Sequence, residues 1–217
     1  MRTMLATVLW HPTSSPGTRG NSEPGDLMAD VLRLENRHTG ELLRLRRVRD
    51  TDGRTALAID GSLPARSSGP PPHVHWQQSE TGTVIAGSLG ARCGTQKVLL
   101  RAGERAVFPA GIVHAWWNAG DDLLELSGQA TPPSDLDRFL QAMFAIVNAA
   151  PSGRPSIFYL AHVLWRHRHT QGIATPPLIV QRVLFPLIVS VGTVLGKYRG
   201  VSWPGCPESC TGAPETE

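Results

Sequence analysis

The stretch "HVHWQQSETGTVIAG", residues 73–87, decides which fold this sequence can adopt. His73 and His75 are separated by one valine and follow three prolines, which favour an extended backbone. In a strand, alternate side chains share a face, so the two imidazoles can reach one metal ion. Glu80 lies five residues further on and cannot share that face of one continuous strand. We therefore predict a turn within "WQQS" that delivers Glu80 from a neighbouring strand.

A second stretch, "GERAVFPAGIVHAWWN" at residues 103–118, supplies a third imidazole. Gly103 lies in a predicted turn, a short strand follows, and the segment from Pro109 to Gly111 is suited to a second tight turn. His114 then starts the next predicted strand. Three histidines and one carboxylate make a mixed nitrogen and oxygen site, which suits Fe(II), Mn(II), Ni(II), Co(II), Cu(II) or Zn(II).

Together the two stretches resemble the cupin superfamily, which carries two sequence motifs. The first has the form G-x5-H-x-H-x3/4-E-x6-G, and the second has the form G-x5-P-x-G-x2-H-x3-N. The second motif matches in full over 103–118. The first departs only at its leading glycine, because Ser67 occupies that position and Gly69 lies two residues later. The resemblance covers the chain from about 29 to 130.

The resemblance implies a fold, a metal site and a set of turns. The implied fold is a small jelly-roll β-barrel. The implied ligands of one divalent transition metal are His73, His75, Glu80 and His114. The positions implied to shape turns or strand ends are Gly87, Gly103, Pro109, Gly111 and Asn118. Glu80 is expected either to be a fourth ligand or to release the metal and act as a catalytic base.

The patterning around these motifs divides the chain into four segments. The middle contains many short alternating runs separated by turns, which is typical of a β-sandwich or barrel. A Ser/Pro/Gly-rich opening lacks periodicity and is expected to be disordered, as is the end of the chain. The predicted segments are an N-terminal extension at 1–27, a β-barrel at 28–130, a helical extension at 131–200 and a tail at 201–217. Met28 is a candidate natural start.

Two to three helices are predicted in the extension. Ser134 is a suitable N-cap with acidic residues after it, and apolar residues then recur at helical spacing. The predicted helical stretches are 135–149, 156–169 and 178–198. The third is apolar and contains Pro186, which is expected to kink it or to start a new helix. We expect this stretch to pack on the barrel or a partner subunit, with membrane-surface contact as a less favoured alternative.

Composition and charge narrow the class of protein. Of the 217 residues, 21 are Lys or Arg and 18 are Asp or Glu, without the basic stripe that nucleic-acid binding requires. The three cysteines, Cys93, Cys206 and Cys210, form no disulfide framework, which favours a cytoplasmic setting. The short apolar run at the N-terminus does not fit a secretory signal.

The residues around the predicted ligands indicate a small-molecule site. Trp116 shares a strand face with His114, so it is expected to line a pocket, although core packing explains it equally well. Gln78 is a candidate substrate-binding residue, although a solvated turn is the plainer interpretation.

We therefore favour a metal-dependent enzyme that acts on a small organic molecule. Oxygen-dependent, dioxygenase-type chemistry is favoured, and isomerase and decarboxylase activities, which also occur among cupins, stay open. The alternative is a non-catalytic small-molecule binding or sensing protein on the same scaffold. Because cupins commonly dimerise, the expected macromolecular partner is a second copy of the chain.

Overall fold

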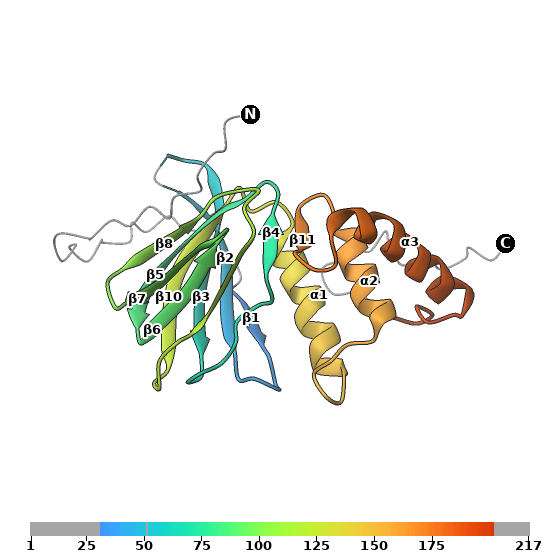
Figure 1. Cartoon of the computed structure of the whole chain (residues 1–217), viewed down its shortest axis with the longest axis horizontal. Helices are drawn as coiled ribbons and strands as arrows, with labels where there is room; N and C mark the ends of the chain where they lie inside the picture. The colour runs from blue at the N-terminus through green and yellow to red at the C-terminus, as the bar shows by residue number, and fades with distance from the viewer. Residues whose placement is uncertain (1–30, 51, 202–217) are drawn as a thin grey trace.

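The computed structural model describes residues 31–50 and 52–201 and contains two antiparallel β-sheets followed by three helices (Figure 1). The first sheet has the strand order β1-β2-β3-β10-β5-β8, and the second has the order β11-β4-β9-β6-β7. The barrel strands are β1 (Leu32–Glu35), β2 (Leu42–Arg49), β3 (Thr55–Leu63), β4 (His73–His75), β5 (Ser79–Ala86), β6 (Ser88–Cys93), β7 (Gln96–Arg101), β8 (Arg105–Phe108), β9 (His114–Asn118) and β10 (Leu124–Thr131). The predicted mainly β, jelly-roll fold is confirmed.

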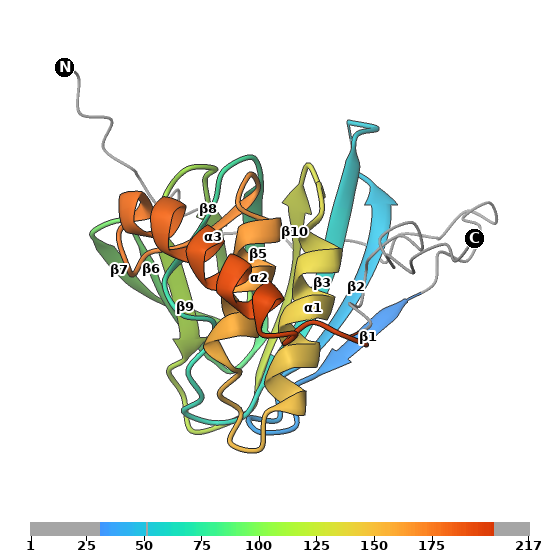
Figure 2. The ribbon, with the colours of Figure 1, turned by 90° about the vertical axis from the view of Figure 1, so that its right-hand side faces the viewer.

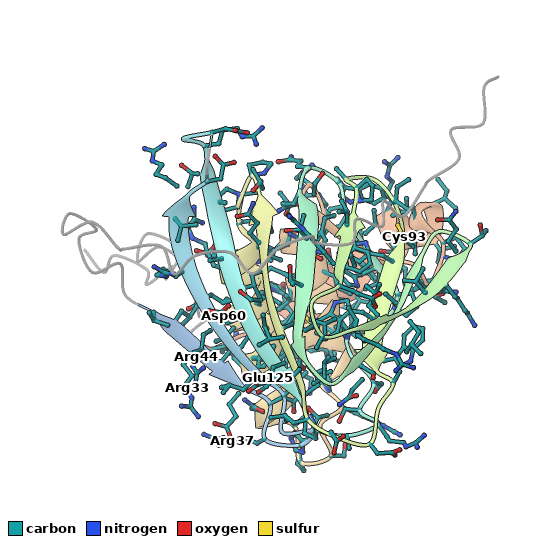
Figure 3. The ribbon with its side chains drawn as sticks, turned by 90° about the vertical axis from the view of Figure 1, so that its left-hand side faces the viewer. Arg33, Arg37, Arg44, Asp60, Cys93 and Glu125 are labelled. Carbon is teal, nitrogen blue, oxygen red and sulfur yellow. The ribbon has the colours of Figure 1, made fainter. Side chains whose placement is uncertain are left out.

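The alternation of side chains decides which face of the first sheet is buried. Leu43 and Leu45 of β2 are almost fully buried, whereas Arg44 between them is exposed. Arg44 pairs across the sheet with Arg33 of β1 and Asp60 of β3, so charged side chains gather on the outer face (Figure 3). The leucines face inward and pack against the helical extension. Burial of this apolar face is therefore a main source of stability.

The helical extension covers one side of the barrel. Its elements are α1 (Leu136–Ala149), α2 (Ile157–Arg166), β11 (Gln171–Ile173) and α3 (Leu178–Val194). α1 lies between the barrel and α2, and α3 lies outermost (Figure 1, Figure 2). All three predicted helical stretches are confirmed as helices. The second and third end earlier than expected.

Two details of the extension correct the sequence-based expectations. The second helix ends at Arg166, because the chain turns there and enters β11, a short unpredicted strand that pairs with β4. Of the two outcomes expected for Pro186, a kink or a new helix, the second is wrong, because Pro186 lies inside α3. β11 adds an edge strand to the second sheet of the barrel, next to β4, so the extension and the barrel share one sheet.

α1 is tied to the barrel at both of its ends. At the start of the helix, Arg47 of β2 donates two hydrogen bonds of 2.9 Å to the carboxylate of Asp137. At its end, the Asn148 side chain donates to the carbonyl of Glu35 at 2.7 Å and accepts from the backbone N–H of Arg37 at 2.9 Å. The helix is therefore held lengthwise against β1 and β2.

α3 packs on α2 and on β11 through a limited set of side chains. Phe185 is 5% exposed and lies against this cluster, with Ile188 and Ile173 beside it. Other apolar side chains of α3 remain exposed, among them Ile179 at 70% and Val183 at 67%. Within residues 31–50 and 52–201, no helix has the length and hydrophobicity of a membrane-spanning segment.

The loop before β4 explains why the first motif lacks its leading glycine. Ser67 does not adopt a positive φ, so its backbone does not require glycine, and its carbonyl accepts a hydrogen bond from the Asn118 N–H at 3.0 Å. A Cβ added to Gly69 would lie 2.2 Å from the carbonyl oxygen of Trp116. Because no Cβ can approach so closely, the position that requires glycine lies two residues later than in the motif.

The other motif positions lie where the chain reverses. Gly87, Gly103 and Gly111 adopt φ values of 83°, 86° and 78°, a region that glycine enters without strain. The carbonyl of Pro109 accepts from the N–H of Ile112 at 3.3 Å within the turn before β9.

Some predictions concern residues that the structure does not describe. Those outside the described ranges are the 1–27 extension, Met28, all of the 201–217 tail after residue 201, Cys206 and Cys210. Cys93 is described and is a buried free thiol. The predicted boundary between barrel and extension, at 130/131, lies one residue before the end of β10 at Thr131, and α1 starts at Leu136.

Candidate metal centre

Strands from both sheets bring the four predicted ligands together inside the barrel. β4 carries His73 and His75, and β9 places His114 directly opposite His73. Glu80 comes from β5 in the facing sheet, and the chain turns between β4 and β5 as expected. One potential ligand atom from each of these side chains lies within 4.8 Å of the other three. The four residues therefore surround a single point.

Each imidazole is oriented by a hydrogen bond on the side away from that point. The Nδ1–H of His73 donates to the carbonyl of Pro71 at 2.9 Å, and the Nδ1–H of His114 donates to the carbonyl of Ile112 at 2.9 Å. The Nδ1 of His75 also has an oxygen partner, which is described below. With Nδ1 protonated and bonded, the Nε2 atom of a neutral imidazole keeps its lone pair for a metal.

The four groups influence one another strongly because they are buried. Burial, with the neighbouring imidazoles His114 and His75, lowers the pKa of His73 to about 3, so His73 is neutral at physiological pH. Burial disfavours ionisation of Glu80, but His75 and His114 outweigh it and hold the pKa of Glu80 well below its usual value. Burial also disfavours protonation of His75, yet Glu80 raises the pKa of His75 overall.

These residues fit a bound transition metal. The Nε2 of His75 is buried and has no hydrogen-bond partner among the described residues, although it lies 3.3 Å from a Glu80 oxygen. The Nε2 of His114 lies 3.2 Å from the other oxygen of Glu80. An orphaned buried nitrogen beside a carboxylate is a donor set that a divalent cation would satisfy. When bound, such an ion would supply Lewis-acid or redox chemistry at its open positions.

The partner of His75 comes from the C-terminal extension and was not predicted. Gln171 of β11 pairs with His75 of β4, and its side-chain oxygen accepts the hydrogen bond from the Nδ1 of His75. Gln171 is 4% exposed. It is separated from His75 by 96 residues and lies in a strand of three residues, so neither spacing nor periodicity could identify it. The extension thus helps to build the metal centre.

A cavity of about 290 Å³ opens beside the cluster, between the barrel and α1. His73, His75 and Glu80 line it, and Trp116 lines it as the sequence indicated. Gln78 does not belong to its lining; this side chain is fully buried, with neither amide atom hydrogen-bonded to a described residue. Of the two residues predicted to bind substrate, Trp116 lines the cavity and Gln78 does not.

A second ionisable residue in the cavity was not predicted. Glu41, directly before β2, lines the cavity together with Leu43. Burial raises the pKa of the Glu41 carboxyl to about 7. In the sequence Glu41 begins an alternating, arginine-rich strand and is indistinguishable from an exposed hairpin residue.

Comparison with known proteins finds a family match within the barrel. Residues 61–127 match the family model described as "Cupin domain". The chain has no significant match among curated proteins.

Several solved structures are similar to part of the chain. KdgF from Halomonas sp. is 19% identical, with a TM-score of 0.39, covering 49% of this chain and 90% of that protein. The oxalate decarboxylase of Lactobacillus farciminis, in a formate complex, is 17% identical, with a TM-score of 0.40, covering 54% and 39% of the two chains. A sugar phosphate isomerase of the cupin superfamily from Silicibacter pomeroyi is 23% identical, with a TM-score of 0.35, covering 41% and 59%. Because these identities and TM-scores are low, the structural similarity indicates nothing about the activity of this chain.

Replacing Gln171 tests the contribution of β11 to the metal centre. Gln171→Leu removes the acceptor for the Nδ1–H of His75, and we expect metal affinity to fall about 10- to 100-fold. Gln77→Leu is a matched control, because Gln77 donates to the His169 carbonyl and contacts no predicted ligand. Competition with a chromophoric chelator measures both affinities. Unchanged affinity in Gln171→Leu, or an equal loss in both variants, would contradict this role.

The pH dependence of stability tests the environment of Glu41. Its raised pKa means that the folded state keeps a proton that the unfolded state loses, so stability falls as pH rises from about 4.5 to 7. At about 1.4 kcal/mol per pKa unit, the loss is at most about 3 to 4 kcal/mol. Glu41→Gln should remove this loss, whereas Glu125→Gln on the exposed outer face should keep it. Urea unfolding at several pH values measures the difference, and parallel profiles for Glu41→Gln and wild type would refute the assignment.

Proposed function

We propose that the protein is a metal-dependent enzyme acting on a small organic molecule, because residues 61–127 match the cupin domain family model. The observation that carries the proposal is the position of the four-residue cluster. Its side chains do not only surround one point; three of them also form part of the wall of a cavity of about 290 Å³. A molecule in that cavity would lie against the metal ligands, as catalysis requires.

The chemistry that we propose first is oxidation by molecular oxygen, with both oxygen atoms entering the organic product. Three imidazoles and one carboxylate suit iron, manganese, copper and related divalent metals, several of which are redox-active. The walls of the cavity are largely apolar, which excludes water from the reacting groups. Isomerisation and decarboxylation use the same donor set and are the next reactions to test.

The chain's own residues have separable roles in this proposal. His73, His75 and His114 would hold the metal, and their Nδ1 bonds fix the ring orientations. Glu80 would be the fourth ligand or, once released, would accept a proton from the substrate. Trp116 would provide an aromatic wall beside the substrate.

We also propose that the protein forms a homodimer. The support is the apolar surface of α3, where Ile179, Val183 and Val194 are exposed. Exposed apolar side chains gathered on one helix are typical of a surface that binds another protein chain. The expected cytoplasmic setting and the absence of nucleic-acid partners stay proposals of the same standing.

Turnover by the metal-loaded protein tests the proposed function. The full chain would be loaded with Fe(II) or Mn(II) and screened for substrate-dependent oxygen consumption against a library of small organic acids, phenols and amines. We expect turnover that is lost in His114→Ala and retained in Glu125→Gln, because only His114 belongs to the ligand cluster.

The same screen includes anaerobic product analysis, which detects isomers and decarboxylated products. Tight binding of a library compound without any product under either condition would contradict the enzyme proposal. It would favour the alternative, a non-catalytic binding or sensing protein.

A further inference from the structure

The cavity beside the metal ligands is elongated. Leu136 at the start of α1 and Val147 near its end both line it. At a rise of 1.5 Å per residue, these two positions are about 16 Å apart along the helix. One cavity therefore follows most of α1, which lies lengthwise against the barrel (Figure 2).

The register of the first sheet gives a second measure of this length. Glu80 is paired with Ala130 of β10, and Ala130 is paired with Leu57 of β3. Leu57 is in turn paired with Arg47 of β2, so Arg47 lies in the same row across the sheet as Glu80. Glu41 lies six residues back along the chain, which is about 20 Å in a strand. Glu41 and the metal ligands are thus at opposite ends of the cavity.

The wall between the two ends is apolar. Leu43 and Ile59 contribute to it from the sheet, and Phe139, Met143 and Phe144 contribute from α1. Among the described residues that line the cavity, the ionisable groups are limited to His73, His75, Glu80 and Glu41. A molecule that fills the cavity would therefore meet polar groups at its ends and hydrocarbon in between.

Glu41 is the available hydrogen-bond acceptor at the outer end. Its neighbours Asn36 and Thr39 also line the cavity, but their side-chain oxygens accept hydrogen bonds from backbone N–H groups of the β1–β2 turn. The described residues provide no hydrogen bond or ion pair to the Glu41 carboxyl. Thr39 is exposed, so this end of the cavity faces solvent. Partial burial without a partner also explains the raised pKa of Glu41.

We propose that the cavity binds an elongated, largely apolar molecule with one polar end at the metal ligands and a hydrogen-bond donor, an ammonium or a hydroxyl, on Glu41. Glu41 would then be a residue that determines specificity, and the length of α1 would determine which chain lengths fit. The reaction at the inner end rests on the proposed function. Binding at the outer end does not, so the two can be tested separately.

Calorimetry with defined probes tests the proposal on the full chain. The probes are straight-chain carboxylic acids of increasing length, each with a methyl, hydroxyl or amino group at the far end. We expect affinity to rise with length, to reach a maximum and then to fall. At the optimal length, a terminal amine or hydroxyl should bind about tenfold more tightly than a terminal methyl group, as one hydrogen bond to a carboxylate provides.

Two variants separate recognition at the outer end from the length of the cavity. Glu41→Gln should bind the methyl-terminated acids as wild type does and lose most of the preference for the amine. Val147→Phe should fill the outer end and shift the optimum to shorter chains, provided that thermal unfolding shows a folded protein. Glu125→Gln, on the outer face of the same sheet, should change neither property.

The outcomes distinguish this inference from the proposed function. Equal affinity for short and long acids, or an amine preference that survives Glu41→Gln, would overturn the inference, even if the protein turns over a compact substrate. A length optimum that depends on Val147 and Glu41 would support it, even if no probe is converted to product.

Discussion

The convergence of three imidazoles and one carboxylate on a buried point is the constraint on which the rest of the structure depends. An unpaired buried donor or acceptor lowers stability by about 1–3 kcal/mol, so most buried polar groups have a partner. The barrel and the extension together provide an oxygen acceptor for the Nδ1 of each histidine. The Nε2 atoms of the histidines and the carboxylate of Glu80 face one another, and we propose that a metal ion binds between them.

The C-terminal extension takes part in this arrangement. β11 joins the second sheet beside β4 and supplies Gln171 as the partner of His75. α1 covers the open side of the barrel and forms one wall of the cavity. Phe139 connects these parts, because it packs against the barrel cluster and against both clusters between the helices. Removing the extension would therefore expose the apolar face of the barrel and leave His75 without its acceptor.

The residues that the sequence identified are those whose roles depend on local spacing. His73 and His75 share a strand face, and the turn at Pro109 and Gly111 places His114, so a short window contains the information. The helix at 136–149 followed from its apolar periodicity in the same way.

The residues that the sequence did not identify depend on tertiary contacts. Gln171 acts through a strand pairing over 96 residues. Glu41 is unusual only because it lines the cavity between the barrel and α1. The glycine that the first motif lacks is replaced by Gly69, whose role depends on its contact with Trp116. α3 continues through Pro186, a position at which local preference predicts a break.

The metal content of the protein tests the central claim most directly. The full chain would be purified without an affinity tag or chelator and analysed by elemental mass spectrometry, beside His73→Ala and His114→Ala. The account predicts about one equivalent of a divalent transition metal per chain in the wild type and its loss in both variants, because each removes one ligand of the set. A wild-type protein that stays free of metal after reconstitution, or variants that keep a full equivalent, would contradict it.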